Sequence, residues 1–324
     1  MSRGNAELVE VFRGRALNVN SITRFSGADD FPLGEGWHAL LLRFNLALVN
    51  STGTTAITDG ELGVINGITL KTSRGEFPVN GVPAFPLYRF AQIKSGTLPR
   101  RDAIAVTTGT YRVEIPIYFT DPLMNVGEDT ILDTSRYSAI NLEISLGGVA
   151  NLMSVVGDSV LTPTLDAYVL RTRGKVPDKI KPAMAVEYGI RPQAAPASVT
   201  EILLERAANL TYKRLLVHAA NSVTAGVPFS GTEADSIISQ LTLDHDGGRP
   251  YENVLVNVLA DLNKLWYAME TVLVGQYWID FCLDGSTMAA LFSGDKSRLS
   301  VKWINDTLST SGISLAYEGL RPLR

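Results

Sequence analysis

The sequence contains a single cysteine, Cys282, and three histidines, His38, His218 and His245, in 324 residues. One cysteine excludes a disulfide within the chain and suits a reducing compartment. The histidines lie in different segments, without the close spacing of a metal site, so we expect no metal and no cofactor. We find no secretory signal and no apolar run long enough to cross a bilayer.

Charge is also scarce, because charged residues make up only 19% of the chain, against about a quarter in an average protein. This favours either a large all-β core or a protein whose flanks are buried against neighbours. The net charge of −4 provides no general basic field, so we expect no sequence-specific nucleic-acid partner.

No motif in the sequence indicates catalysis, so we predict no catalytic residues and no enzyme. Asp244–Gly248 offers carboxylates and a glycine turn, but it lacks the spaced oxygens of a calcium loop, which favours a plain surface turn. Cys282 lies inside an alternating segment, which indicates a buried thiol rather than a nucleophile.

Short alternating segments separated by turn residues dominate the chain, which has 28 glycines and 15 prolines. Alternation of apolar and polar residues predicts strands. The clearest strands are expected at 37–49, 64–70, 111–119, 140–146, 165–170, 237–243, 277–283, 299–303 and 313–317. Pro116 requires its strand to lie at a sheet edge or bulge. Tyr251–Thr271 follows the 3.6-residue period of a helix. Val82–Ile93 is ambiguous, because Pro83 and Pro86 favour a loop that one helical turn could follow.

Residues 171–182 have no period and contain five basic residues, two prolines and a glycine. Such a run predicts a semi-rigid, exposed connector. We therefore expect an N-terminal arm at 1–16, one β-domain at 17–170, the connector at 171–182 and a second β-domain at 183–324.

The two halves resemble each other in order. Ile68-Thr69-Leu70 matches Leu241-Thr242-Leu243, and Leu41–Asn45 matches Arg214–His218. The pair Ala167-Tyr168 and the pair Leu170-Arg171 match Ala316-Tyr317 and Leu320-Arg321. The ordered series predicts a duplicated β-domain. Each half has about eight candidate strands, which suits an eight-stranded jelly roll.

The N-terminal arm is predicted to be a short helix. Leu8 and Phe12 would share one face of it, and Arg13 and Arg15 would lie at its end, where cations suit the helix dipole. Arg3 adds a further cation. These residues could meet an anionic membrane surface or dock on a neighbouring subunit. Packing of the helix on its own domain is the alternative.

Two β-rich halves, the connector 171–182 and the arm together resemble the double-jelly-roll major capsid proteins of the adenovirus and tectivirus lineage. Chain length and low charge are most similar to those of small membrane-containing icosahedral bacteriophages, such as corticoviruses and finnlakeviruses. The fold class expected is all-β, with two tandem eight-stranded jelly rolls, short helices in loops and the N-terminal helical arm.

The resemblance implies a structural capsid protein that forms homotrimers of pseudo-hexagonal outline and tiles an icosahedral virion over an internal lipid membrane. The implied partners are neighbouring capsid trimers, penton or vertex proteins, minor capsid proteins and lipid. The implied location is the virion, after assembly in the host cytoplasm. Two alternatives remain: a carbohydrate-binding or carbohydrate-active tandem sandwich using exposed aromatics such as Tyr277 and Trp303, and a cupin-like metalloenzyme.

Overall fold

The computed structural model describes residues 6–26, 31–50, 55–105, 107–121, 130–154, 156–172, 184–192, 201–204, 210–221, 229, 231–245, 248–282, 291–292, 299–305 and 312–322. The chain divides into two compact units, Met1–Val186 with Leu323–Arg324, and Glu187–Pro322. The expected connector lies outside the described residues from 173 onward, and Arg171 and Thr172 still belong to a strand. The boundaries of the connector therefore stay a prediction.

The first unit is a sandwich of two four-stranded antiparallel sheets. One sheet has the order β1 (Ala6–Ala16), β9 (Val160–Thr172), β3 (Gly36–Val49), β6 (Gly109–Tyr118), and short β7 (Leu132–Asp133) pairs with the start of β3. The other has the order β2 (Ser21–Phe25), β8 (Ile140–Leu146), β4 (Ile65–Thr72), β5 (Val79–Val82). Without β7, the strands follow the orders 1-8-3-6 and 2-7-4-5 along the chain, which is the winding of a jelly roll.

The second unit has the same winding. Its first sheet has the order β10 (Met184–Pro192), β19 (Gly312–Pro322), β12 (Thr211–Asn221), β16 (Gln276–Asp280), and short β13 (Thr232–Glu233) and β17 (Leu291–Phe292) also pair with β12. Its second sheet has the order β11 (Glu201–Leu203), β18 (Leu299–Asn305), β14 (Ile238–His245), β15 (Gly248–Leu255). The short elements β13 and β17 aside, the orders are again 1-8-3-6 and 2-7-4-5.

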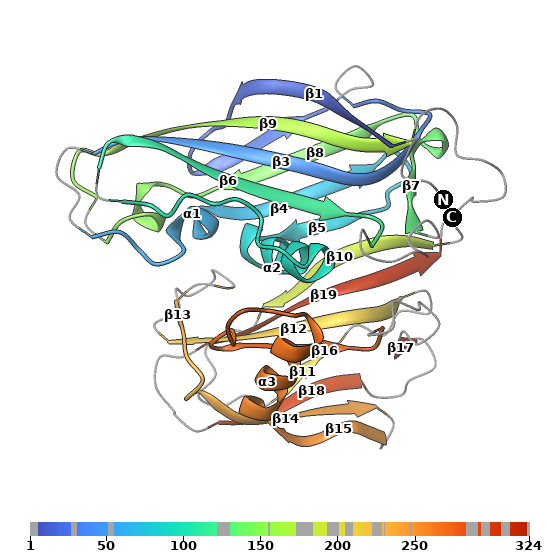
Figure 1. Ribbon diagram of the computed structural model, residues 1–324. Helices are drawn as coiled ribbons and strands as arrows, with labels where there is room; N and C mark the ends of the chain where they lie inside the picture. Colours follow the sequence, from blue (N-terminus) through green and yellow to red (C-terminus); the bar gives the residue numbers. More distant parts are fainter. Residues whose placement is uncertain are drawn as a thin grey trace. The chain divides into compact units, whose positions relative to one another are not determined.

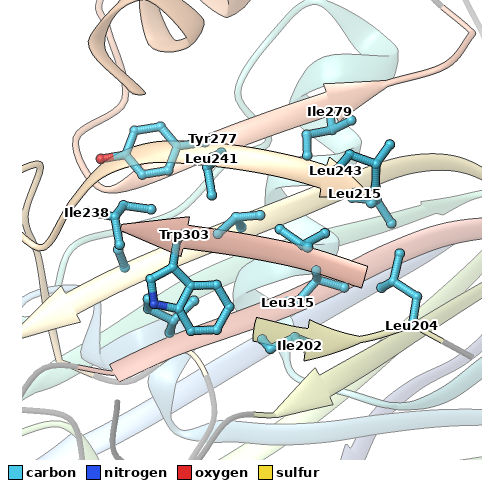
Figure 2. Packing of buried hydrophobic residues seen from close by; sticks show 14 of the residues in the cluster. Ile202, Leu204, Leu215, Ile238, Leu241, Leu243, Tyr277, Ile279, Trp303 and Leu315 are labelled. Atoms are coloured by element: carbon cyan, nitrogen blue, oxygen red, sulfur yellow. The ribbon is translucent and has the colours of Figure 1, made fainter. Parts of the chain in front are cut away.

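The period-two pattern of the strands builds the core of each unit. In β3, Leu40, Leu42 and Phe44 are fully buried and alternate with partly exposed residues. In the second unit, Trp303 of β18 and Leu315 of β19 come from opposite sheets and meet in one cluster (Figure 2). Burial of each such side chain contributes about 1.5–3 kcal/mol.

A bulge that occurs once in each unit shows the repeat most directly. In both units, one residue of the fourth strand, Thr69 or Thr242, lies opposite two residues of the fifth strand. Gly81 and Asn253 occupy the extra position with left-handed φ angles of 61° and 51°. Their N–H groups donate to the hydroxyls of Thr69 and Thr242, both at 3.0 Å. The match between Ile68–Leu70 and Leu241–Leu243 is therefore confirmed by pairing and by hydrogen bonding.

One of the sequence matches is out of register by one residue. Leu42 pairs with Ala167, whereas Leu215 pairs with Tyr317. Tyr317 faces the core of the second unit, but Tyr168 lies on the partly exposed outer side of β9. Matching Ala167-Tyr168 with Ala316-Tyr317 was wrong, because it exchanges the two faces of the sheet.

A helix follows the bulge at the same place in each unit. Helix α2 (Ala84–Ser95) begins three residues after Gly81, and α3 (Val256–Trp266) begins three residues after Asn253. The loop with one helical turn, which the prolines at 82–93 favoured, was wrong, because α2 has 12 residues. The helix expected at 251–271 is shorter, because residues 251–255 belong to β15. Smaller helical turns lie at α1 (Gly60–Gly63), η3 (Thr134–Arg136) and η4 (Val149–Asn151).

The N-terminal helical arm was a wrong prediction. Residues Ala6–Ala16 form strand β1, which pairs antiparallel with β9, and Figure 1 shows β1 in dark blue beside β9. Leu8, Val9 and Phe12 fit a helix face, but they fit a strand equally well over so short a run. Pairing with β9 adds the first strand that the jelly roll needs. Pro116 agrees with prediction, because β6 ends the described order of its sheet.

Candidate interaction surface

Helix α3 lies along the edge of strand β16. The Asn263 side chain accepts from the backbone N–H of Trp278 at 2.8 Å and donates to its carbonyl at 3.2 Å. Among the described strands, β16 is an edge strand, so the N–H and C=O groups of Trp278 have no neighbouring strand on that side. The side-chain amide of Asn263 makes the hydrogen bonds that a further strand would make. The helix buries Val256, Leu259 and Ala260 beside Asn263.

A second side of α3 is apolar and exposed. Leu255 and Val258 are each 46% exposed, Leu265 is 75% exposed, and Trp266 is 39% exposed. Together with partly exposed Leu262 they lie at helical spacing along one side. We call Leu255, Val258, Leu262, Leu265 and Trp266 the α3 stripe.

The sequence pattern identified the helix but not the side that the core buries. The residues with the clearest 3.6-residue period are those of the α3 stripe, which the chain itself leaves exposed. The four most exposed side chains of the stripe, all except Leu262, together expose on the order of 400 Å² of apolar surface. Apolar patches of about this size on a monomer are often functional.

Helix α2 of the first unit has the opposite property. The positions that correspond to Val258, Leu262 and Leu265 are Pro86, Phe90 and Ile93, and all three are buried. The same side of the repeated helix is therefore buried in one unit and exposed in the other.

Strands β12, β16 and β19 carry a cluster of buried charges. Arg214 Nε lies 2.8 Å from Asp280 Oδ2, and its Nη1 lies 2.9 Å from Glu318 Oε2. Lys213 Nζ lies 3.3 Å from Glu318 Oε1. The Tyr267 hydroxyl donates to Asp280 at 2.7 Å. Burial and the adjacent Asp280 raise the pKa of Tyr267, so it stays a donor at neutral pH.

Sequence reasoning did not find this cluster, because cross-strand partners are set by register. The available signal was a charged residue inside otherwise apolar strands, at Arg214, Asp280 and Glu318. Two cations and two carboxylates meet in one place there, which is the arrangement expected of buried charges.

The arm residues are divided by the fold. Leu8 is 60% exposed, and Arg13 and Arg15 are exposed as well. Phe12 is buried and stacks on Phe25, with ring centroids 4.8 Å apart. Arg3 lies outside the described residues. Leu8 and Phe12 therefore do not form one exposed apolar face, because Phe12 points into the core.

The residues considered for chemistry are mostly buried. Cys282 is buried, as predicted, and desolvation raises its pKa to about 12. Tyr277 and Trp303 are buried too, so they do not supply the exposed aromatics that a carbohydrate groove requires. His38 is a strand residue of β3, as predicted, whose ring lies 2.9 Å from the Thr172 hydroxyl.

Among the described residues, no group of three or more His, Cys, Asp or Glu side chains is placed to hold a metal ion. Asp246 and Gly247 of the Asp244–Gly248 turn lie outside those residues. Within the part of the chain that the structure describes, no helix has the length and apolar character needed to span a membrane.

The winding of both units defines the class of fold, which is the double jelly roll of viral major capsid proteins. The chain is similar to the major capsid protein P2 from bacteriophage PM2, with 13% identity, a TM-score of 0.64 and 98% of each chain covered. It is also similar to the major capsid protein of Sulfolobus turreted icosahedral virus, with 13% identity, a TM-score of 0.72, and 98% and 97% covered. VP54 of PBCV-1 matches with 10% identity, a TM-score of 0.62, and 97% and 93% covered.

Comparison of the sequence alone gives no relative. No protein-family profile matches the chain, and no curated protein matches it. The likeness therefore lies in the fold, over nearly the full length of both partners.

Proposed function

We propose that this protein is the major capsid protein of an icosahedral virus and that it assembles as a homotrimer. The observation that carries the proposal is the full-length likeness to capsid proteins, two jelly rolls in one chain, at a TM-score of 0.72. The α3 stripe supports it, because a self-assembling subunit leaves apolar surface open until it meets its neighbours. The protein acts by contact area and carries out no reaction.

The oligomeric state tests this proposal. Light scattering coupled to size exclusion should give three times the chain mass of 35.1 kDa. Negative-stain images of the same peak should show particles of hexagonal outline, because each trimer presents six jelly rolls. A protein that stays monomeric at high concentration would overturn the proposal.

In the virion, the trimers would contact neighbouring trimers, vertex proteins and minor capsid proteins, after assembly in the host cytoplasm. A glycan-binding role has no support from the buried positions of Tyr277 and Trp303.

An internal membrane is the proposed surface for the chain's N-terminal residues. Leu8, Arg13 and Arg15 are exposed on β1, and Arg3 precedes them; Phe12 contributes by holding β1 on Phe25. Cations near an anionic lipid surface contribute about 1 kcal/mol each. Flotation with vesicles containing phosphatidylserine should fall for an Arg3, Arg13 and Arg15 triple alanine variant. Arg24→Ala, another exposed arginine, is the control, and equal flotation of all three proteins argues against membrane contact.

A further inference from the structure

We propose that the α3 stripe of one copy covers the outer face of the β1-β9-β3-β6 sheet of the next copy. This inference rests on the proposed homotrimer and names the surfaces that build it. The partner is a second copy of this chain, and the contact is head-to-tail, because a ring of three needs two different surfaces on each subunit.

The repeat identifies the two surfaces. The stripe side of the helix is exposed in α3, whereas Pro86, Phe90 and Ile93 of α2 are buried. The outer face of the sheet that contains the first strand of each unit has the opposite distribution of exposure. In the second unit that face is buried, with Leu216 and Ala316 both 0% exposed. In the first unit it is partly exposed. The α3 stripe is thus exposed where the equivalent side of α2 is buried. The outer face of the β1-β9-β3-β6 sheet is partly exposed where the equivalent face of the second unit is buried.

The sheet face offers an apolar row to the stripe. Leu41 of β3 lies between Pro116 of β6 and Tyr168 of β9 by strand register, and all three are partly exposed. Ala47 continues the same side of β3. Apolar side chains from two copies would therefore meet in this contact.

Arg43 and Asp166, two charged residues of this sheet, already have partners on it. Arg43 Nε lies 3.0 Å from Glu114 Oε1, and its guanidinium lies 5.5 Å from the centre of the Tyr168 ring. Asn45 donates to Asp166 at 3.2 Å. Covering paired charges costs less desolvation energy than covering isolated ones. The stripe contains no charged residue.

The area is of the right order for one shared surface. The stripe exposes on the order of 400 Å², about half of the 800 Å² that one partner buries in a standard interface. The stripe would therefore be the apolar centre of the contact, with polar residues such as Asp261 and Lys264 of α3 at its rim.

Cysteine cross-linking tests the contact, since the native Cys282 is buried. The double variant Leu41→Cys with Leu265→Cys is treated with a short bismaleimide. Covalent dimers and trimers are expected, because each copy carries both halves of the contact. Ser21→Cys with Leu265→Cys is the control: Ser21 is exposed on the other sheet of the first unit, and only monomers are expected after denaturation.

The remaining outcomes separate this inference from the proposed function. Cross-linked dimers from Leu265→Cys alone mean that stripes meet each other, which overturns the head-to-tail contact. A trimer in solution with no cross-link in the Leu41 variant overturns the surfaces but leaves the proposed function standing. In a second measurement, Leu265→Asp should weaken trimer formation at least tenfold with an unchanged circular dichroism spectrum. Leu98→Asp, another exposed leucine, should leave the trimer intact, and equal behaviour of both variants overturns the inference.

Discussion

At the scale of single residues, the described part of the second unit pairs several of its buried charges with one another. The buried cluster of Arg214, Asp280 and Glu318 is the clearest case, because each of the three has less than a tenth of its surface exposed. A charge buried there without its partner would be strongly disfavoured.

Removal of one carboxylate from this cluster is predicted to be costly. Glu318→Gln leaves Arg214 and Lys213 with one fewer anion, and the free energy of unfolding should fall by about 3–5 kcal/mol. Denaturant titration measures this change. The control is Glu143→Gln, which breaks the exposed pair with Arg24 and should cost less than about 1 kcal/mol. Similar losses for both variants would mean that the cluster is not buried.

The Cys282 thiol is predicted to be unreactive in the folded protein. Burial raises its pKa from 9.0 to about 12, so almost no thiolate forms at pH 8. A disulfide reagent should label it only after unfolding in guanidinium. Because the folded pKa is the higher one, the thiol's contribution to stability is complete below pH 9 and is lost as the pH rises towards 12. Rapid labelling of the native protein at pH 8 would contradict this.

At the scale of elements, the alternation of apolar and polar residues predicted most strands. The sequence pattern did not predict which strands pair or which side of a helix is buried. The period-two spacing of Leu40, Leu42 and Phe44 is enough to predict their strand. For residues 6–16 the spacing is not enough, because Leu8, Val9 and Phe12 satisfy two periods at once and only the edge of β9 selects the strand. Helix α3 was recognised by the residues of its exposed stripe, so the pattern identified a helix without telling which side the core takes.

The hydroxyls of Thr69 and Thr242 are predicted to stabilise the bulge in each unit, because each accepts a backbone N–H there. Thr69→Val and Thr242→Val remove the acceptor of the N–H groups of Gly81 and Asn253, and each should cost about 1–2 kcal/mol of unfolding free energy. Similar losses of unfolding free energy for the two variants are expected if the bulge has the same role in both units. Thr23→Val, on the edge strand β2, is a matched exchange outside the bulge, although Thr23 itself accepts from Asn18 N–H. A bulge variant that costs no more than Thr23→Val would contradict the role.

The left-handed position in the bulge should distinguish residue types. A Cβ at Gly81 meets no atom within 4 Å, so the φ angle of 61° alone limits substitution. Gly81→Asn copies the second unit and should be tolerated, because Asn enters the left-handed region readily. Gly81→Val should cost at least about 1–2 kcal/mol. Thermal unfolding of the two variants side by side measures the difference, and equal midpoints would contradict the conformational explanation.

At the scale of the whole molecule, the order of the two halves could be predicted from sequence, but their function could not be assigned from any residue. The matched strings at Thr69 and Thr242 are short, and they gain weight only when the same bulge, hydrogen bond and helix follow each. The buried cluster and the sheet face around Leu41 depend on cross-strand neighbours more than 60 residues apart, which no local pattern specifies.

Assembly through apolar contacts predicts how the trimer responds to salt. The α3 stripe has no charged residue, and Arg43 on the proposed partner face already pairs with Glu114. Screening of surface charges should therefore not dissociate the trimer. Sedimentation equilibrium at about 0.05 M and about 1 M sodium chloride should give the same or tighter association, because salt also reduces repulsion between copies of net charge −4. Dissociation at the higher concentration would mean that ion pairs between copies, rather than buried apolar surface, hold the assembly together.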